Sequence, residues 1–464
     1  MSNWRGPLVA VIVLALLVGF YLLWEPADQA EAPDVEEDIF VTSLDWEGLR
    51  AVSVRWGDEP ELRIELGEDG VYRLTSPASR PADQDRARLL FKTAAELRAN
   101  RIIAGEEEAD PTDYGLDSPD RHIVMETVDG EEIVVEVGDA SPIVLDEYTS
   151  RYARVDGAGD IYLVAGIRLD FFTAPFERWR DAAIIHIDDV VRATVVASRG
   201  TWTAEKVGGI FEWELVEPYS VPAPISTMEQ FVREIRNLRA REFVDDEPSR
   251  EQLEEWDLVD GVNRVTLANA RGDEVTLIIG RFVDSQGSES YVRREDEDSV
   301  YISSTRFYSA PGFTDVTEWV EPSPLSVIGR EDILAVEVER PGATVRLVRG
   351  EDSWILEGID GAEHSHERAT VNMLIDRLRR ISTRDVIWPD EEGAHDAMED
   401  VAGRITISYE HPDGEREISL EVANPSPGSD RVHARVEGYA VVYVFPEELA
   451  GYLDLSETLE SLAE

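Results

Sequence analysis

Three short stretches of alternating apolar residues decide the fold: residues 49–54 read LRAVSV, residues 191–196 read VRATVV and residues 334–338 read LAVEV. An alternation with period two is typical of a strand that buries one face. The stretches start about 140 residues apart, which is the size of a typical domain. They therefore indicate that one unit occurs three times along the chain.

The elements that follow each stretch support this repeat. An aromatic-led strand comes next, at residues 72–74 (YRL), 213–215 (WEL) and 354–356 (WIL). One long helix then follows in each copy, and apolar residues at every third or fourth position predict it over residues 83–99, 226–239 and 367–381. Ser226 and Glu229 have the spacing of a capping box at the start of the second helix.

The second half of each copy is also repeated. An aromatic and leucine element stands at residues 114–117 (YGLD) and 256–258 (WDL), whereas the third copy has HDAM at residues 395–398. A glycine-containing hairpin turn follows, and then two closing strands that include residues 152–154 (YAR), 291–293 (YVR) and 433–435 (HAR). We therefore predict an α+β fold with repeat 1 at 39–188, repeat 2 at 189–325 and repeat 3 at 326–464.

An uncharged apolar segment precedes the repeats. Residues 7–24 read PLVAVIVLALLVGFYLLW, long enough for a transmembrane helix. Arg5 precedes it and acidic residues follow it, so the positive-inside rule predicts a cytoplasmic stub at 1–6 and an acidic tether at 25–38. This makes the chain a single-pass inner-membrane protein with a periplasmic body. A cleaved signal peptide, with Ala30-Glu31-Ala32 at its end, is the alternative, but bulky Tyr21 and Trp24 favour a retained anchor.

The chain is strongly acidic and contains no cysteine. Its 97 Asp and Glu residues against 44 Lys and Arg residues give a formal net charge of −53. Such a charge repels nucleic acid and anionic lipid surfaces. It fits either a solvated surface adapted to a salty medium or a surface that binds cations. Without cysteine the chain has no disulfide and no cysteine-based zinc site.

Catalytic motifs are missing from the sequence. It contains no Gly-x-Ser-x-Gly, no phosphate-binding loop, no His-Glu-x-x-His and no calcium-binding loop. The best metal-like cluster is His364-Ser365-His366-Glu367, which serves equally well as a polar lead-in to the third helix. We therefore predict no catalytic residue, no cofactor and no metal ligand.

Clusters of charged residues allow two interpretations. The acidic runs at 106–108, 295–298 and 390–392 fit solvated turns or loose calcium binding. The arginines near the helix ends and on the closing strands fit pairing with the acid excess, or recognition of an anion. They are Arg73, Arg98, Arg101, Arg154, Arg239, Arg241, Arg293, Arg379, Arg380 and Arg435.

Repeat 1 resembles a known bacterial family. Pro81-Ala82-Asp83 before a helix, residues 114–119 (YGLDSP), Val137-Gly138, residues 152–154 and Trp179-Arg180-Asp181 are similar to the domain-of-unknown-function family numbered 4340, DUF4340, over residues 72–185. Repeats 2 and 3 match it more weakly. The resemblance implies one N-terminal anchor helix and an auxiliary role beside ABC transporters of the gliding-motility type. The family has no established active site, so the resemblance assigns no residue a role.

These observations lead to three hypotheses about function. The first is a non-catalytic, membrane-anchored extracytoplasmic interaction protein that serves an ABC transporter or another cell-envelope assembly, with protein partners and no nucleic acid. The second is an envelope module that binds a ligand or polymer between repeats. The third is an envelope hydrolase. The sequence does not identify the partner, the ligand or the oligomeric state.

Overall fold

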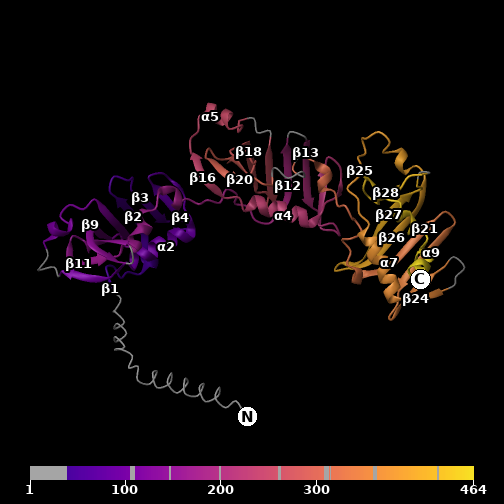
Figure 1. Ribbon diagram of the computed structural model, residues 1–464, viewed down its shortest axis with the longest axis horizontal. Helices are drawn as coiled ribbons and strands as arrows, with labels where there is room; N and C mark the ends of the chain where they lie inside the picture. Colours follow the sequence, from indigo (N-terminus) through magenta and orange to yellow (C-terminus); the bar gives the residue numbers. More distant parts are fainter. Residues whose placement is uncertain are drawn as a thin grey trace, which may run out of the picture. The chain divides into compact units, whose positions relative to one another are not determined.

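The computed structural model describes residues 39–104, 110–145, 148–197, 200–259, 263–307, 313, 315–358, 363–425 and 428–463. The chain divides into two compact units, Met1–Asp181 and Ala182–Glu464. The first unit holds one large antiparallel sheet, sheet 1, and the second unit holds two, sheet 2 and sheet 3 (Figure 1). The predicted repeat boundaries are not tested by this division and stay predictions.

The three sheets have nine strands each and the same strand order. In sheet 1 the order is β5-β4-β3-β2-β8-β9-β10-β11-β7, and sheets 2 and 3 repeat it strand for strand. Sheet 1 consists of β2 (Leu49–Trp56), β3 (Leu62–Leu66), β4 (Tyr72–Ser76), β5 (Arg80–Pro81), β7 (Arg101–Ala104), β8 (Arg121–Thr127), β9 (Glu132–Leu145), β10 (Tyr148–Val155) and β11 (Ala158–Val164). A separate two-stranded sheet joins β1 (Ile39–Phe40) to β6 (Arg98–Ala99).

The strands of the second unit follow the same plan. Sheet 2 consists of β12 (Val190–Ala197), β13 (Gly200–Lys206), β14 (Trp213–Glu217), β15 (Val221–Pro222), β16 (Ala240–Asp245), β17 (Arg264–Asn269), β18 (Glu274–Phe282), β19 (Glu289–Arg294) and β20 (Val300–Ser304). Sheet 3 consists of β21 (Ile333–Arg340), β22 (Ala343–Arg349), β23 (Ser353–Glu357), β24 (Glu363–Glu367), β25 (Val386–Ile387), β26 (Val401–His411), β27 (Gly414–Ala423), β28 (Arg431–Val436) and β29 (Val442–Pro446).

One long helix lies along a face of each sheet: α2 (Gln84–Ala95), α4 (Ile225–Arg236) and α7 (Arg368–Arg380) (Figure 1). Each helix buries a single stripe, such as Val371, Leu374, Ile375 and Leu378 of α7. The other helical segments are short. They are α3 (Gly166–Leu169), α5 (Arg250–Glu255), α8 (Glu448–Gly451), α9 (Leu455–Ala463), and the 3-10 turns η1 (Trp46–Gly48), η2 (Pro111–Tyr114), η3 (Asp170–Thr173), η4 (Phe176–Trp179), η5 (Val316–Trp319), η6 (Arg330–Asp332) and η7 (Asp396–Met398).

The predicted fold class needs correction. Strands dominate the structure and helices are few, so an α+β fold with a transmembrane helix does not describe it. No helix among the described residues is long and apolar enough to cross a membrane. The long helices have 12 or 13 residues, and a bilayer needs about 20 mostly apolar ones. The predicted span 7–24, its stub 1–6 and its tether 25–38 lie outside the described residues. We therefore do not propose a single-pass membrane protein.

Two helix boundaries also differ from the prediction. Helix α2 ends at Ala95 rather than at residue 99, because the Thr42 hydroxyl donates to the Ala94 carbonyl and accepts from the Leu97 amide, and the chain then turns into β6. Ser226 does not cap α4, since Pro224 is the N-cap and Ser226 lies inside the helix. A capping box occurs instead at Ser249 in front of α5.

The core of the second unit is continuous across sheets 2 and 3. At the junction the Tyr439 hydroxyl donates to Glu214 Oε1 at 2.5 Å, and the rings of Tyr219 and Trp388 stack with centroids 6.0 Å apart. Glu321 lies at the same junction with 8% of its surface exposed, and burial raises the pKa of its carboxyl above its ordinary value. The Ser323 amide donates to this carboxyl at 3.0 Å.

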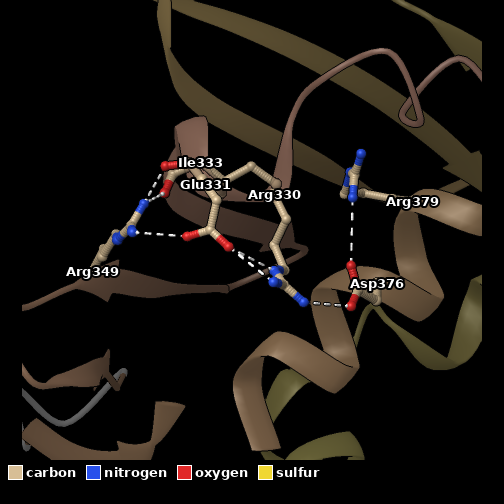
Figure 2. A network of polar contacts seen from close by, with 6 residues as sticks. All are labelled: Arg330, Glu331, Ile333, Arg349, Asp376 and Arg379. Atoms are coloured by element: carbon tan, nitrogen blue, oxygen red, sulfur yellow. Dashed lines mark hydrogen bonds and ion pairs between the residues drawn. The ribbon is translucent and has the colours of Figure 1, made fainter. Parts of the chain in front are cut away.

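Charged residues fix the start of sheet 3 to α7. Arg330 lies 2.8 Å from Glu331 and 2.9 Å from Asp376, and Figure 2 shows it between the two carboxylates. Arg349 reaches Glu331 from β22, and Arg379 reaches Asp376 at 3.4 Å. The hydrogen bond from Arg330 holds the pKa of Glu331 below its ordinary value.

Candidate functional site

The residues behind the family resemblance meet on one face of sheet 1. Residues 114–116, which we call plug 1, begin at the last residue of the 3-10 turn η2, where the Asp110 side chain accepts from the Thr112 amide. Gly115 has a φ of 67°, a conformation that favours glycine. This turn directs Leu116, which is 0% exposed, against the sheet.

Gly138 of β9 is the seat for plug 1. A Cβ atom at this position would lie 2.2 Å from the Tyr114 carbonyl oxygen and 3.0 Å from Leu116 Cγ. Val137 and Ala153 belong to the core that α2 covers. Gly138 and its neighbours at alternate positions therefore face the other side of the sheet, and plug 1 covers that side.

Two side chains of β10 hold plug 1 in place. The Tyr152 ring meets the Tyr114 ring edge to face, with centroids 4.9 Å apart. Arg154 donates from Nη2 to the Leu116 carbonyl and from Nε to Glu136 Oε2, each at 2.5 Å. Its side chain is 12% exposed and that of Glu136 is 17% exposed. The guanidinium is therefore engaged in hydrogen bonds that hold plug 1 against the sheet.

Sheet 2 carries the same arrangement with different residues. Plug 2, residues 256–258, follows α5, and Asp257 takes the left-handed position with a φ of 59°. Leu258 is 0% exposed, and a Cβ atom on Gly280 would lie 2.1 Å from the Trp256 carbonyl oxygen. The Trp256 ring stacks on the Tyr291 ring, with centroids 5.2 Å apart.

The residue that lies opposite the closing-strand arginine differs between the sheets. Arg154 lies opposite Glu136 and Arg435 lies opposite Glu421, but Arg293 lies opposite Ile278. Arg435 is 2.7 Å from Glu421 and its hydrogen bond holds the pKa of that carboxyl below its ordinary value. Ile278 instead joins a small apolar cluster with Trp256 and Leu258.

Sheet 3 has no counterpart of the buried leucine in the described residues around η7. Met398 occupies this place and packs against Ala423 and Val442. The plug motif is thus a packing turn in two sheets, and it is replaced by a single methionine in the third.

The residues of plug 1 and plug 2 and their contacts in sheets 1 and 2 belong to the stretches that a family model matches. The model described as domain of unknown function (DUF4340) covers residues 73–209 and 213–400, more than half of the chain. The chain belongs to the DUF4340 family. The resemblance found in the sequence is therefore confirmed, whereas the association with ABC transporters stays a prediction. A search of curated proteins found no match.

The two DUF4340 matches start at equivalent strands. The first begins in β4 and runs past β13, and the second begins at the start of β14. The first DUF4340 match thus combines seven strands of sheet 1 with the first two strands of sheet 2. The DUF4340 segment and the structural sheet therefore have different starting points along the chain.

Short extended segments close one edge of the first two sheets. In sheet 1 residues 179–181, which we call strap 1, pair with the end of β5 and the residues after it: the Asp83 amide donates to the Trp179 carbonyl at 2.8 Å and the Asp181 amide donates to the Pro81 carbonyl at 2.9 Å. In sheet 2 residues 319–321, strap 2, lie in the equivalent place, where the Glu321 amide donates to Pro222 at 2.8 Å.

Each strap is anchored by a buried tryptophan. Trp179 is 0% exposed and lies under the guanidinium of Arg86, 4.8 Å from its ring centroid. Trp319 is 5% exposed and contacts the rings of Trp202 and Phe231. Trp179 was singled out from the sequence, but Trp319 was missed. Their separation of about 140 residues, equal to the repeat, was the available signal.

The histidine cluster lies on an edge strand. His364 and His366 belong to β24 at the edge of sheet 3, opposite Leu356 and Trp354. Within the part of the chain that the structure describes, no group of three or more His, Asp or Glu side chains is arranged to hold a metal ion.

The acidic runs are spread over several turns. Residues 106–108 lie outside the described residues. In the run at 295–298, Glu295 lies 2.8 Å from Arg264, and Arg294 contacts Asp296 and Glu297. In the run at 390–392, Glu391 accepts from the Trp388 amide.

Several of the arginines chosen from the sequence form ion pairs with nearby acids. Arg73 pairs with Asp69, Arg241 with Glu289, and Arg379 with Asp376. Arg98 lies over the ring of Phe40, 5.2 Å from its centroid. These arginines are distributed over several elements: Arg73 and Arg154 lie in sheet 1, Arg241 and Arg293 in sheet 2, Arg435 in sheet 3, Arg98 in β6, and Arg379 and Arg380 in α7.

Proposed function

We propose that this DUF4340 chain is a non-catalytic, extracytoplasmic interaction protein that serves a transporter or another cell-envelope assembly. One observation carries the proposal: the motif residues of the family, Tyr114, Leu116, Gly138, Tyr152 and Arg154, are engaged with one another in packing sheet 1. A framework repeated three times then offers faces and edges for partner proteins. The family resemblance supports the envelope location and the transporter.

An affinity-tagged full chain, recovered from detergent-solubilised cells after mild cross-linking, tests this proposal. We expect ABC-transporter subunits to copurify in a fixed ratio with the chain. Recovery of no protein partner, together with binding to cell-wall glycan, would contradict the proposal.

A small pocket in unit 1 favours binding of a ligand or polymer as the second candidate. It has a volume of about 180 Å³ and is lined by aromatic and proline side chains, among them Trp56, Pro60, Phe172, Pro175 and Phe176. Aromatic walls of this kind receive an apolar side chain or the face of a sugar. Loss of glycan binding in Trp56→Ala, with thermal stability retained, would support this candidate.

A further inference from the structure

The outer edge of sheet 3 differs from the same edge of sheets 1 and 2. Strands β5 and β15 have two residues each and end in Pro81 and Pro222, whereas β24 has five residues and no proline. Ser365 takes the place of the prolines, since it pairs with Ile355 as Pro81 pairs with Arg73 and Pro222 with Glu214.

The backbone of Ser365 faces away from the sheet. In an antiparallel strand the N–H and C=O groups of one residue point to the same side. The Pro81 and Pro222 carbonyls accept hydrogen bonds from the straps, so this position points outward in sheets 1 and 2. The same register directs both backbone groups of Ser365 outward, and serine has the N–H that proline lacks.

No strap lies on β24 within the described ranges. The backbone hydrogen bonds of these residues include none that joins another segment to the outer edge of β24. The segment that follows sheet 3 instead forms α8 and α9, and α9 packs against α7. β24 therefore presents an edge of the kind that another extended segment can extend.

Two buried polar atoms lie beside this edge without a hydrogen-bond partner in the described structure, Trp354 Nε1 and His366 Nε2. Both belong to the face of sheet 3 that carries the core, because His366 lies opposite Trp354. In sheet 2 the equivalent Trp213 donates to Glu229 at 2.9 Å. A buried polar group without a partner costs free energy, so a bound segment that supplies a polar group to His366 Nε2, on the edge strand itself, would be favoured.

The carboxylates beside β24 indicate which charge an added strand should carry. The strand reads EHSHE, and Glu357 and Glu367 are exposed on the face opposite the core. A second copy of the chain would place like charges opposite each other, which is destabilising. Lysine or arginine at alternate positions of an incoming strand would instead lie beside Glu367 of β24, and these side chains are long enough to reach toward Glu357 of the neighbouring β23.

We propose that β24 is a docking strand, on which an extended segment of a partner protein with Lys or Arg at alternate positions pairs as a tenth strand. The pairing is antiparallel, as the Ala82 and Arg180 bridge of strap 1 is. This inference rests on the proposed function, because it names the surface through which the interaction protein holds a partner.

A peptide-binding experiment on the full chain tests the docking strand. The probe is a fluorescein-labelled peptide of sequence KVKTKV, and EVETEV is its charge-reversed control. We expect KVKTKV to bind and to slow hydrogen exchange at residues 363–367. Ser365→Pro removes the outward N–H as in sheets 1 and 2, and should weaken binding about tenfold or more. Ser365→Ala keeps the backbone groups and should bind within about twofold of the unchanged chain.

A second variant keeps the test decisive if Ser365→Pro perturbs folding. Glu357→Lys combined with Glu367→Lys should transfer the preference from KVKTKV to EVETEV. Equal binding of KVKTKV to Ser365→Pro, protection outside residues 353–367, or no binding of either peptide would overturn the docking strand. A dimer of the chain that Ser365→Pro dissolves would also overturn it, since a second copy would then be the occupant.

The pull-down separates this inference from the proposed function. If transporter subunits copurify equally with Ser365→Pro, the proposed function stands and the docking strand is wrong. If KVKTKV binds as expected but no envelope protein copurifies, the surface is right and the proposed function is wrong.

Discussion

The seat of plug 1 permits a sharp prediction about stability. Gly138→Ala places a methyl group 2.2 Å from the Tyr114 carbonyl oxygen, which is backbone, and 3.0 Å from Leu116 Cγ, which is buried. Neither neighbour can rotate away without displacing η2 or exposing Leu116. We therefore expect unit 1 to lose stability, even though alanine usually suits a strand better than glycine.

The size of the effect follows from two opposing contributions. Overpacking of this kind costs about 3 kcal/mol at the upper end of the usual range. Replacement of glycine by alanine recovers about 0.4–1 kcal/mol through the unfolded chain. The net loss of about 2 kcal/mol corresponds to a fall in Tm of about 4–8 °C for a unit of this size.

Differential scanning calorimetry of the full chain measures this fall, and the matched control is Gly48→Ala. A Cβ atom on Gly48 would have no neighbouring atom within 4 Å, and Gly48 has no positive φ, so its substitution should change Tm little. Gly280→Ala, with Gly209→Ala as its control, repeats the comparison for plug 2. Equal Tm values for Gly138→Ala and Gly48→Ala would refute the role of Gly138 as a seat.

Three further predictions concern other buried contacts. Burial raises the pKa of the Glu321 carboxyl, so the folded protein favours its protonated form. The stability that this form contributes is present below the unfolded pKa of the carboxyl and is lost as pH rises through its folded pKa. Glu321→Gln should therefore stabilise unit 2 at neutral pH, and calorimetry should show a flatter dependence of stability on pH. Arg154→Met should cost about 2 kcal/mol in denaturant unfolding, because Glu136 loses its partner, and adding Glu136→Ile should restore most of the loss. Trp179→Ala should cost about 3–5 kcal/mol and speed hydrogen exchange at residues 80–83, because strap 1 is released.

Each of these predictions has a contrary outcome. Glu331 is the comparison for Glu321, because Arg330 lowers the pKa of Glu331 whereas burial raises that of Glu321. Glu331→Gln should therefore destabilise the unit above the ordinary carboxyl pKa. If stability depended on pH in the same way in both variants, the opposite pKa shifts of the two carboxyls would be contradicted. Additive losses in the Arg154 and Glu136 double variant would show that the ion pair is not coupled. Unchanged exchange at 80–83 in Trp179→Ala would mean that the strap does not protect the edge.

The periodic elements were the predictable part of the fold. Residues 191–196 alternate and lie in β12, and the apolar stripe of residues 367–381 lies in α7, because one buried face imposes its period directly on the sequence. The glycine-containing turns were predictable as well, because a tight hairpin turn needs a positive φ, which glycine adopts readily; Gly130 has a φ of 85° and Gly272 a φ of 88°.

The parts that depend on distant contacts were not predictable. The two-residue strands β5 and β15 are too short to show a periodicity, so the sequence indicated only that Pro81 precedes a helix and did not single out Pro222. Glu321 is placed by its hydrogen bond to Pro222, which lies about 100 residues earlier, and Trp319 is placed by its contacts with Trp202 and Phe231. Residues 114–117 were recognisable as a repeated aromatic and leucine element, but the glycine seat at Gly138 becomes evident only when β9 is placed beneath Leu116.

The position of strap 1 in the sequence has a consequence for biosynthesis. All strands of sheet 1 and its strap are encoded before Val190, where sheet 2 begins. A ribosome adding about 5–20 residues per second thus completes every strand of sheet 1, and the strap on its β5 edge, before it adds the first strand of sheet 2. Neighbouring copies with identical strand order would otherwise compete for each other's strands, and this order of delivery limits such mispairing during synthesis.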